Sequence, residues 1–301
     1  MDWNKLLSSR RYQPGSTITM FRSHDRSQFQ RDYDRLIFSS PFRRLQNKTQ
    51  VFPLPGNIFV HNRLTHSLEV ASVGRSLGNK IAQFVKTKET LEHPEILEEI
   101  GTIVSTACLA HDLGNPPFGH SGEEAISYFF TEGEGQYLKK LLTDEEWADI
   151  SHFEGNANTF RLLPHSFNGR RPGGYTMTFT TLASIVKYPF ESKASLKGHK
   201  YGFFQSEKEI YKEMAEELGI IQLNTKPLQY VRHPLVYLVE AADDICYQIM
   251  DIEDSHKLKI LSYDETTRIL LNFYDKDADK EDLKTISRTF KIVTDKNECI
   301  A

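Results

Sequence analysis

The chain has 301 residues, of which 39% are hydrophobic and 26% charged, and this composition is typical of a soluble globular protein with one large or two moderate domains. Its 37 Lys and Arg against 41 Asp and Glu give a formal charge of −4, which excludes a globally basic nucleic-acid-binding surface but leaves room for local basic patches. Three widely spaced cysteines do not suggest a disulfide framework. Apolar runs near the candidate motifs fall short of the ~20 residues that span a bilayer, and the first residues lack the apolar stretch of a secretory signal. We therefore expect a cytoplasmic protein without a membrane segment.

In chain order, the first clear helix is predicted over residues 62–85, where apolar side chains recur at helical spacing. A second helix is predicted over residues 95–110. It ends at His111-Asp112-Leu113-Gly114-Asn115-Pro116-Pro117, because glycine and two prolines prevent continuation. Ser121 then offers an N-cap for a third helix, with Glu123 in its first turn.

The second half of the chain also reads mostly as helix. Further helices are predicted over residues 155–163, 206–218 and 234–253, with weaker periodicity over 264–274 and 280–293. Residues 169–174 are typical of a loop or a short hairpin connection, and 175–186 fit a strand followed by a helix, which periodicity alone cannot decide. No βαβ alternation and no repeat of 20–50 residues occurs. The predicted class is mostly α, with a minor β or hairpin element.

Polar ligand-type side chains interrupt three apolar helical segments. His66 lies in the first helix, His111 and Asp112 at the end of the second, and Asp243 with Asp244 within residues 237–245. Taken singly, the histidine is typical of a hydrogen-bonded core residue and the aspartate pair of a solvated face or a cap. Together they favour a shared cation, because buried charges need compensation. Two imidazoles with carboxylates favour Mn²⁺, Fe²⁺, Co²⁺, Mg²⁺ or Ni²⁺ with open coordination positions over a closed structural zinc site.

These positions resemble the H…HD…D signature of the HD-domain metal-dependent phosphohydrolases. Longer stretches resemble the deoxyguanosine triphosphate triphosphohydrolase (dGTPase) branch, in the same order along residues 3–254. The matching blocks are Arg43–Pro53, Arg63–Val70, His111–His120, Phe153–Ala157 and Glu240–Tyr247. The resemblance implies an HD-domain helical bundle whose divalent metal ion is held by His66, His111, Asp112 and Asp243.

The resemblance also implies roles for side chains that would otherwise be interpreted as ordinary surface or loop residues. His120 matches the catalytic histidine of the family and Glu123 its partner, and their spacing of three lets the carboxylate orient the imidazole. The matching substrate-binding residues are Gln50, Arg63, Asn156, Lys187, Tyr188, Lys200 and Tyr247. Within this set, Arg63 is implied to grip the triphosphate and Gln50 to face the sugar.

The activity that the resemblance implies is metal-assisted hydrolysis of a deoxynucleoside triphosphate, with dGTP preferred, to a deoxynucleoside and inorganic triphosphate. His120 either transfers a proton or positions the nucleophile, and the sequence leaves both roles open. A homo-oligomer is expected from the resemblance alone. Residues 1–60 are expected to form an N-terminal segment with a substrate-contacting loop, and 61–255 the HD core. Residues 256–301 are expected to begin a C-terminal helical region that is incomplete here.

Two other functions stay open. One is an HD phosphohydrolase that acts on another nucleotide, a monophosphate or an alarmone, and the residues implied to bind a triphosphate argue against it. The other is a nucleotide-sensing or single-stranded nucleic-acid-binding module, supported by the runs Arg10-Arg11, Arg43-Arg44 and Arg170-Arg171. The net charge of −4 and the presence of His120 and Glu123 count against it as the main function. Single-strand binding as a secondary activity would show a steep salt dependence.

Overall fold

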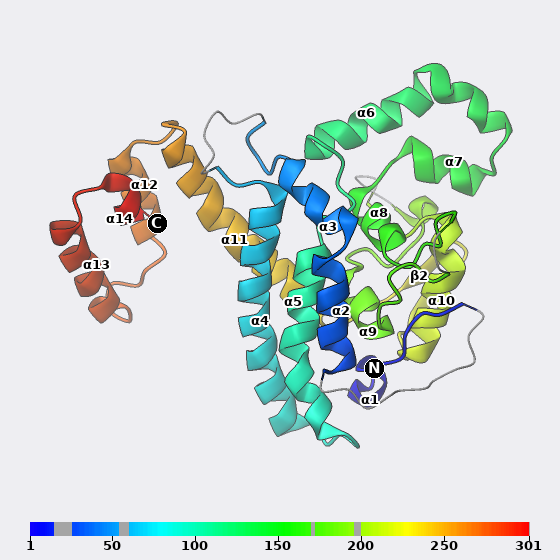
Figure 1. Ribbon diagram of the computed structural model, residues 1–301, viewed down its shortest axis with the longest axis horizontal. Coiled ribbons are helices and arrows are strands. Elements are labelled where there is room, and N and C mark those ends of the chain that lie inside the picture. Colours follow the sequence, from blue (N-terminus) through cyan, green and yellow to red (C-terminus); the bar gives the residue numbers. More distant parts are fainter. Residues whose placement is uncertain (15–25, 54–59, 170–171, 196–199, 301) are drawn as a thin grey trace. The chain divides into compact units, whose positions relative to one another are not determined.

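A computed structural model describes residues 1–14, 26–53, 60–169, 172–195 and 200–300, and helices dominate it (Figure 1). The α-helices are α1 (Trp3–Leu6), α2 (Gln28–Ile37), α3 (Ser40–Arg44), α4 (Arg63–Lys88), α5 (Ile100–Ala110), α6 (Gly119–Thr131), α7 (Asp144–Ser151), α8 (Gly155–Leu162), α9 (Phe179–Ile185), α10 (Lys208–Glu217), α11 (Val236–Lys257), α12 (Tyr263–Leu271), α13 (Lys280–Ile292) and α14 (Lys296–Ile300). Short 3₁₀ helices are η1 (Leu45–Asn47), η2 (Pro94–Glu99), η3 (Glu134–Lys140), η4 (Ser192–Ala194) and η5 (Gln205–Glu207). Strands β1 (Gln222–Thr225) and β2 (Leu228–Tyr230) form one antiparallel pair. The mostly α prediction is confirmed.

The chain divides into two compact units. The larger comprises Met1–Gln50 and Asn62–Asp243, and the smaller comprises Val51–His61 and Asp244–Ala301. In the smaller unit, the backbone N–H of His61 donates to Asp254 at 2.9 Å and the His61 ring contacts the same carboxylate, so this short segment is tied to α11. The division of the chain at residues 60 and 255 stays a prediction.

The core of the larger unit forms around α5. Side chains from Ile100 to Ala110 are buried all round this helix except at Thr102, and a helix that is apolar on every face must be covered on every face. Helices α2, α4 and α9 pack against it (Figure 1). Glycines allow α4 and α5 to approach closely, because a Cβ at Gly78 would lie 2.9 Å from the Cα of Gly101.

Most predicted helices lie where periodicity places them. The helices predicted over residues 62–85, 155–163, 206–218, 234–253, 264–274 and 280–293 correspond to α4, α8, α10, α11, α12 and α13. The single helix predicted over 95–110 is divided into η2 and α5. Residues 175–186 form α9 after one isolated bridge between Thr178 and Arg11. The strand pair lies at 222–230, and residues 170–171 of the predicted 169–174 loop lie outside the described residues.

The start of α6 was predicted wrongly. Ser121 is not the N-cap; the helix begins at Gly119, and Phe118 precedes it with a φ of +66° and without a side-chain cap. The N–H of Gly119 donates to the carbonyl of Pro116, which closes a tight turn after the two prolines and starts the helix three residues early. His120 therefore lies inside the helix rather than in the loop before it.

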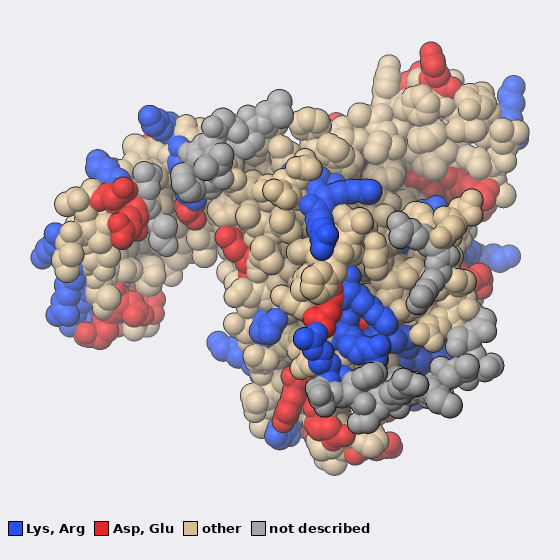
Figure 2. All heavy atoms as spheres, in the orientation of Figure 1, with Lys and Arg blue, Asp and Glu red and all other residues tan. Residues whose placement is uncertain are grey.

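Two of the three basic runs can be described. Arg10 pairs with Glu213 and Glu217, while the Arg11 guanidinium is buried against Asp32 at 2.5 Å. This run therefore connects parts of the larger unit, whereas Arg43-Arg44 is exposed at the end of α3. On the face of the larger unit in Figure 2, Lys and Arg gather in separate patches with red and tan atoms between them. Arg170-Arg171 lies outside the described residues.

Among the described residues, none of the helices combines the length and the apolar character that crossing a bilayer requires.

Replacing Gly78 with Ala should lower the free energy of unfolding by about 1–3 kcal/mol, because the added methyl overpacks the contact between α4 and α5. At an exposed helix position the same change would stabilise the helix by about 1 kcal/mol. Urea unfolding measures the difference. Ser76→Ala, on the exposed side of α4, is the matched control and should stay within about 0.5 kcal/mol of the wild type. A stabilised Gly78→Ala protein would contradict the described packing.

Candidate active site

The loop after α5 is fixed by its backbone. His111 is the C-cap of α5, and Gly114 follows where the loop passes against α8. A Cβ at Gly114 would lie 2.1 Å from the backbone N of Thr159, so only glycine fits. The Thr159 hydroxyl donates to the carbonyl of His111 at 3.1 Å and accepts from the N–H of Gly114 at 2.9 Å. The Lys48 ammonium donates to two further carbonyls of this loop. The loop is therefore held from two sides.

The first turn of α4 presents two of the predicted residues. Asn62 is the N-cap, and its side-chain oxygen accepts from the N–H groups of Leu64 and Thr65 at 3.0 Å each. This capping box sets where the helix begins, so that Arg63 and His66 point to the same side as the loop after α5. His66 is only 1% exposed.

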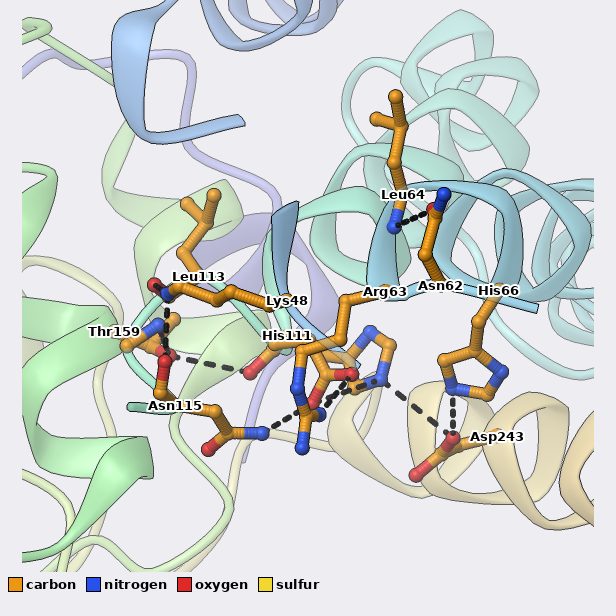
Figure 3. A network of polar contacts seen from close by, with 12 residues as sticks. Lys48, Asn62, Arg63, Leu64, His66, His111, Leu113, Asn115, Thr159 and Asp243 are labelled. Carbon is orange, nitrogen blue, oxygen red and sulfur yellow. Dashed lines mark hydrogen bonds and ion pairs between the residues drawn. The ribbon is translucent and has the colours of Figure 1, made fainter. Parts of the chain in front are cut away.

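Four potential ligands converge at this place. Nε2 of His66 lies 3.0 Å and Nε2 of His111 lies 3.5 Å from Oδ1 of Asp243, which comes from α11. The ligand atoms of His66, His111 and Asp112 all lie within 4.8 Å of one another. In Figure 3 the side chains of His66, His111 and Asp243 point toward one another. Two imidazole nitrogens and two carboxylates around one point are a donor set that suits a divalent transition metal ion.

Hydrogen bonds and charge prepare this group for a cation. Nδ1 of His111 donates to the carbonyl of Cys108 at 2.6 Å, which leaves Nε2 to face the carboxylates. Burial acts to raise the pKa of Asp243, but the His111 and His66 imidazoles outweigh it and hold this pKa at about 2. Burial likewise opposes ionisation of Asp112, and His111 and Arg63 outweigh it and lower its pKa. Both carboxylates therefore stay ionised and attract positive charge.

Arg63 lies behind the ligand group. Its Nη1 donates to Oδ2 of Asp112 at 2.6 Å, and the amide of Asn115 donates to the other oxygen of the same carboxylate. Arg63 is buried and is not part of the pocket wall described next. Gln50 is also absent from that wall, and its buried amide oxygen has no hydrogen-bond partner among the described residues. Their implied contacts with triphosphate and sugar stay predictions.

A pocket of about 250 Å³ opens beside the ligand group. It brings together the predicted residues His111, Asp112, His120, Glu123, Asn156, Lys187, Tyr188, Lys200 and Asp243, and its other wall residues are Asn115, Ile185, Val236, Val239 and Glu240. Candidate metal-ligand and proton-transfer side chains thus share one cavity with two lysines. Tyr247 belongs to the smaller unit, where it is 52% exposed, and its implied role stays a prediction.

The predicted pair on α6 is in contact. Nδ1–H of His120 donates to Oε2 of Glu123 at 2.8 Å, and the other oxygen of Glu123 accepts from the N–H of Gly155 at 2.8 Å. The imidazole is 81% exposed, whereas the carboxylate is only 12% exposed. Glu123 is therefore fixed and orients His120, and Nε2 of His120 is left to accept or donate a proton.

Three buried or half-buried carboxylates hold the two lysines. The Lys200 ammonium lies 2.9 Å from Glu154 and 3.7 Å from Glu123, and that of Lys187 lies 3.1 Å from Glu240. Burial acts to lower the pKa of each lysine, but these partners outweigh it and raise it, so both stay protonated at neutral pH. The sequence prediction missed Glu154 and Glu240, although both lie in blocks that carry the family resemblance. The one signal for them in the sequence is that Glu154 lies shortly before Asn156 and Glu240 shortly before Asp243, both predicted site residues.

Comparisons with known proteins identify relatives of this chain. A family model described as the HD domain matches residues 63–188. The chain is 44% identical over 277 residues to the deoxyguanosinetriphosphate triphosphohydrolase-like protein of Pseudomonas aeruginosa, covering 90% of this chain and 61% of that protein. It is 44% identical to the protein of the same name from Synechocystis, covering 87% and 62%. A deoxyguanosinetriphosphate triphosphohydrolase of Yersinia enterocolitica is 35% identical, covering 79% and 51%. The chain thus spans between half and two thirds of the length of these relatives.

Replacing Thr159 with Val should weaken divalent-metal binding about tenfold, because it leaves the loop that carries His111 without its hydroxyl contacts. It should also lower the free energy of unfolding by about 1–3 kcal/mol. Thr180→Val is the matched control, since its buried hydroxyl donates to carbonyls of Leu6 and Ser8 away from the pocket. The control should lose stability and keep its metal affinity, measured by isothermal titration. Equal metal affinity in both variants would refute the role of Thr159.

Proposed function

Since this chain belongs to the HD domain family, among relatives named deoxyguanosinetriphosphate triphosphohydrolase or triphosphohydrolase-like, we propose that it hydrolyses deoxynucleoside triphosphates, dGTP first among them, in a metal-dependent reaction. One observation carries this proposal. The pocket wall combines three of the four proposed ligands, His111, Asp112 and Asp243, with the His120–Glu123 pair and two protonated lysines within one cavity. A triphosphate ester needs a Lewis acid, a proton-transfer group and counter-charges, and these three elements supply them.

The divalent ion would be held by His66, His111, Asp112 and Asp243. Their mixed nitrogen and oxygen donors fit Mn²⁺, Mg²⁺, Fe²⁺, Co²⁺ or Ni²⁺, and the ionised carboxylates in a largely buried setting support a bound cation. Such an ion supplies Lewis-acid polarisation of a phosphoryl oxygen. The open side of the ligand group faces the pocket, where a phosphate could approach.

Charge in the pocket explains why nucleotide binding would require the metal ion. The wall carries four carboxylates, Asp112, Glu123, Glu240 and Asp243, but only two lysines. This excess of negative charge repels a triphosphate until a divalent cation neutralises it. Lys187 and Lys200, both protonated, would then neutralise phosphate oxygens.

In the proposed reaction a water oxygen forms a bond to the α-phosphorus while the bond from phosphorus to the 5′-oxygen breaks. The 5′-oxygen leaves as the hydroxyl of the deoxynucleoside after taking up a proton, and inorganic triphosphate is the second product. His120 is suited to manage that proton or to orient the water, because Glu123 fixes its Nδ1 and leaves Nε2 available. Cytoplasmic location and a homo-oligomeric state belong to the same proposal.

The test is product analysis after incubation with each dNTP and Mn²⁺ or Mg²⁺. Deoxynucleoside with intact triphosphate supports the proposal, and the relative rates rank the bases. Release of orthophosphate or pyrophosphate instead would show that a phosphoanhydride bond is cleaved and would contradict the proposed reaction. Single-stranded nucleic-acid binding is the second candidate function, favoured by the exposed Arg43-Arg44 run, and its affinity should fall steeply with salt. Salt-insensitive binding would count against it.

Replacing His120 with Ala should lower turnover of dGTP by about 10²–10⁴-fold, because the proposed proton-transfer group is lost. Metal and nucleotide affinity should change little, since the side chain is exposed and contacts only Glu123 among the described residues. His165→Ala is the matched control: its imidazole also contacts a glutamate, Glu207 at 3.0 Å, but lies outside the pocket wall. Near-normal turnover in His120→Ala would refute its role.

Replacing Asp243 with Asn should weaken divalent-metal affinity by at least about tenfold and reduce turnover at limiting metal, because one anionic ligand becomes neutral. Asp244→Asn, at the next position on α11, changes an exposed carboxylate in the same way and should behave as the wild type. Metal titration with nucleotide turnover measures both. Equal effects of the two substitutions would argue against Asp243 as a ligand.

A further inference from the structure

Arg232 lies in the connection between β2 and α11, outside the pocket wall, and its side chain is held on three sides. Its Nη1 donates to Oε2 of Glu240 at 2.8 Å. The guanidinium carbon lies 5.7 Å from the ring centroid of Tyr188 and 5.5 Å from that of Tyr237. A planar cation in contact with two aromatic rings, with a carboxylate as third partner, has little freedom to move.

Glu240 connects this arginine to the pocket. While Oε2 accepts from Arg232, Oε1 lies 3.1 Å from the ammonium of Lys187, and Glu240 and Lys187 both line the cavity. The Lys187 ammonium also lies 5.7 Å from the ring centroid of Tyr188. Arg232, Glu240, Lys187 and Tyr188 therefore form a closed set of contacts, in which Lys187 and Tyr188 are residues that the family resemblance implies to bind substrate.

We propose that Arg232 is a positioning residue for Lys187 and Tyr188 in nucleotide binding. Glu240 contacts both Arg232 and Lys187, and through this contact it orients Lys187 toward the pocket. One carboxylate with two cations leaves the three groups with a net positive charge. The stacked guanidinium fixes the ring of Tyr188 at the same time. This inference rests on the proposed nucleotide substrate, but the contacts that carry it are those of the free protein.

The charge balance gives the proposal a distinctive consequence. Without Arg232, Glu240 would pair with Lys187 only. Because a nearby positive charge favours deprotonation of a lysine, the loss of the Arg232 charge should raise the pKa of Lys187. Replacing Arg232 with Gln should raise KM for dGTP about tenfold and leave kcat within about threefold, because Arg232 reaches no reacting atom. Arg232→Lys keeps the charge but loses the planar stack, so its KM should lie between those of Arg232→Gln and the wild type.

Amine labelling at a fixed pH of about 8, followed by mass spectrometry of Lys187, tests the contact without any nucleotide. In Arg232→Gln the labelling of Lys187 should slow about threefold, and in Glu240→Gln it should accelerate, because the lysine loses its counter-charge. Lys193 is the internal reference, since it is similarly exposed and pairs with Glu145 outside the pocket wall. A purely structural role for Arg232 would expose Lys187 and accelerate its labelling in both variants.

Arg10→Gln is the matched control variant. Arg10 also pairs with glutamates, Glu213 and Glu217, and its guanidinium carbon lies 5.3 Å from the centroid of the Phe179 ring, away from the pocket wall. It should change neither KM nor the labelling of Lys187.

Unchanged or faster labelling of Lys187 in Arg232→Gln would overturn the proposal, as would the expected labelling with an unchanged KM. If the wild type hydrolyses no dNTP, the proposed function fails, and labelling still decides whether Arg232 sets the state of Lys187.

Discussion

A buried carboxylate must be matched by positive charge or hydrogen bonds, and this constraint determines much of how the larger unit is built. Asp32 is matched by Arg11, Glu207 by Arg161, and Asp112 by Arg63. Each pair joins segments far apart in the sequence. Asp243 is the instructive contrast: its described partners are the imidazoles of the ligand group, which are weaker counter-charges than a guanidinium. These three carboxylates thus have guanidinium partners, whereas Asp243 has imidazoles, and the divalent ion proposed above would complete its compensation.

The same constraint shows why some of the site could be predicted and some could not. The ligand positions His66, His111, Asp112 and Asp243 each interrupt an apolar helical frame, and such interruptions are visible along the chain. Glu154, Glu240 and Arg232 were missed, because a counter-charge is identified only when tertiary packing places it beside its partner. In sequence these are ordinary charged residues next to a helix or within it.

The prediction of helices and strands from sequence also fails where tertiary structure or local backbone geometry decides. Long helices such as α4 and α11 were predicted because side-chain periodicity persists over many turns. The beginning of α6 was predicted wrongly, since the left-handed backbone at Phe118 is set by the turn after two prolines and not by a capping side chain. The strand pair at 222–230 was also not located: all four residues of β1 are exposed, so no alternation of apolar and polar residues marks it.

The two halves of the candidate chemistry lie on helices of opposite character. Two of the four ligand residues, His111 and Asp112, follow the end of α5, which is buried almost throughout. The helix α6, which carries His120 and Glu123, has no buried side chain, and the structure describes all of its residues. Amide hydrogens of α5 should therefore exchange with solvent only when the whole unit opens, while those of α6 exchange through local fraying. Heating would then separate the two: the His120–Glu123 pair would lose its fixed position while the candidate ligand residues stay together, well below the temperature at which the helical core melts.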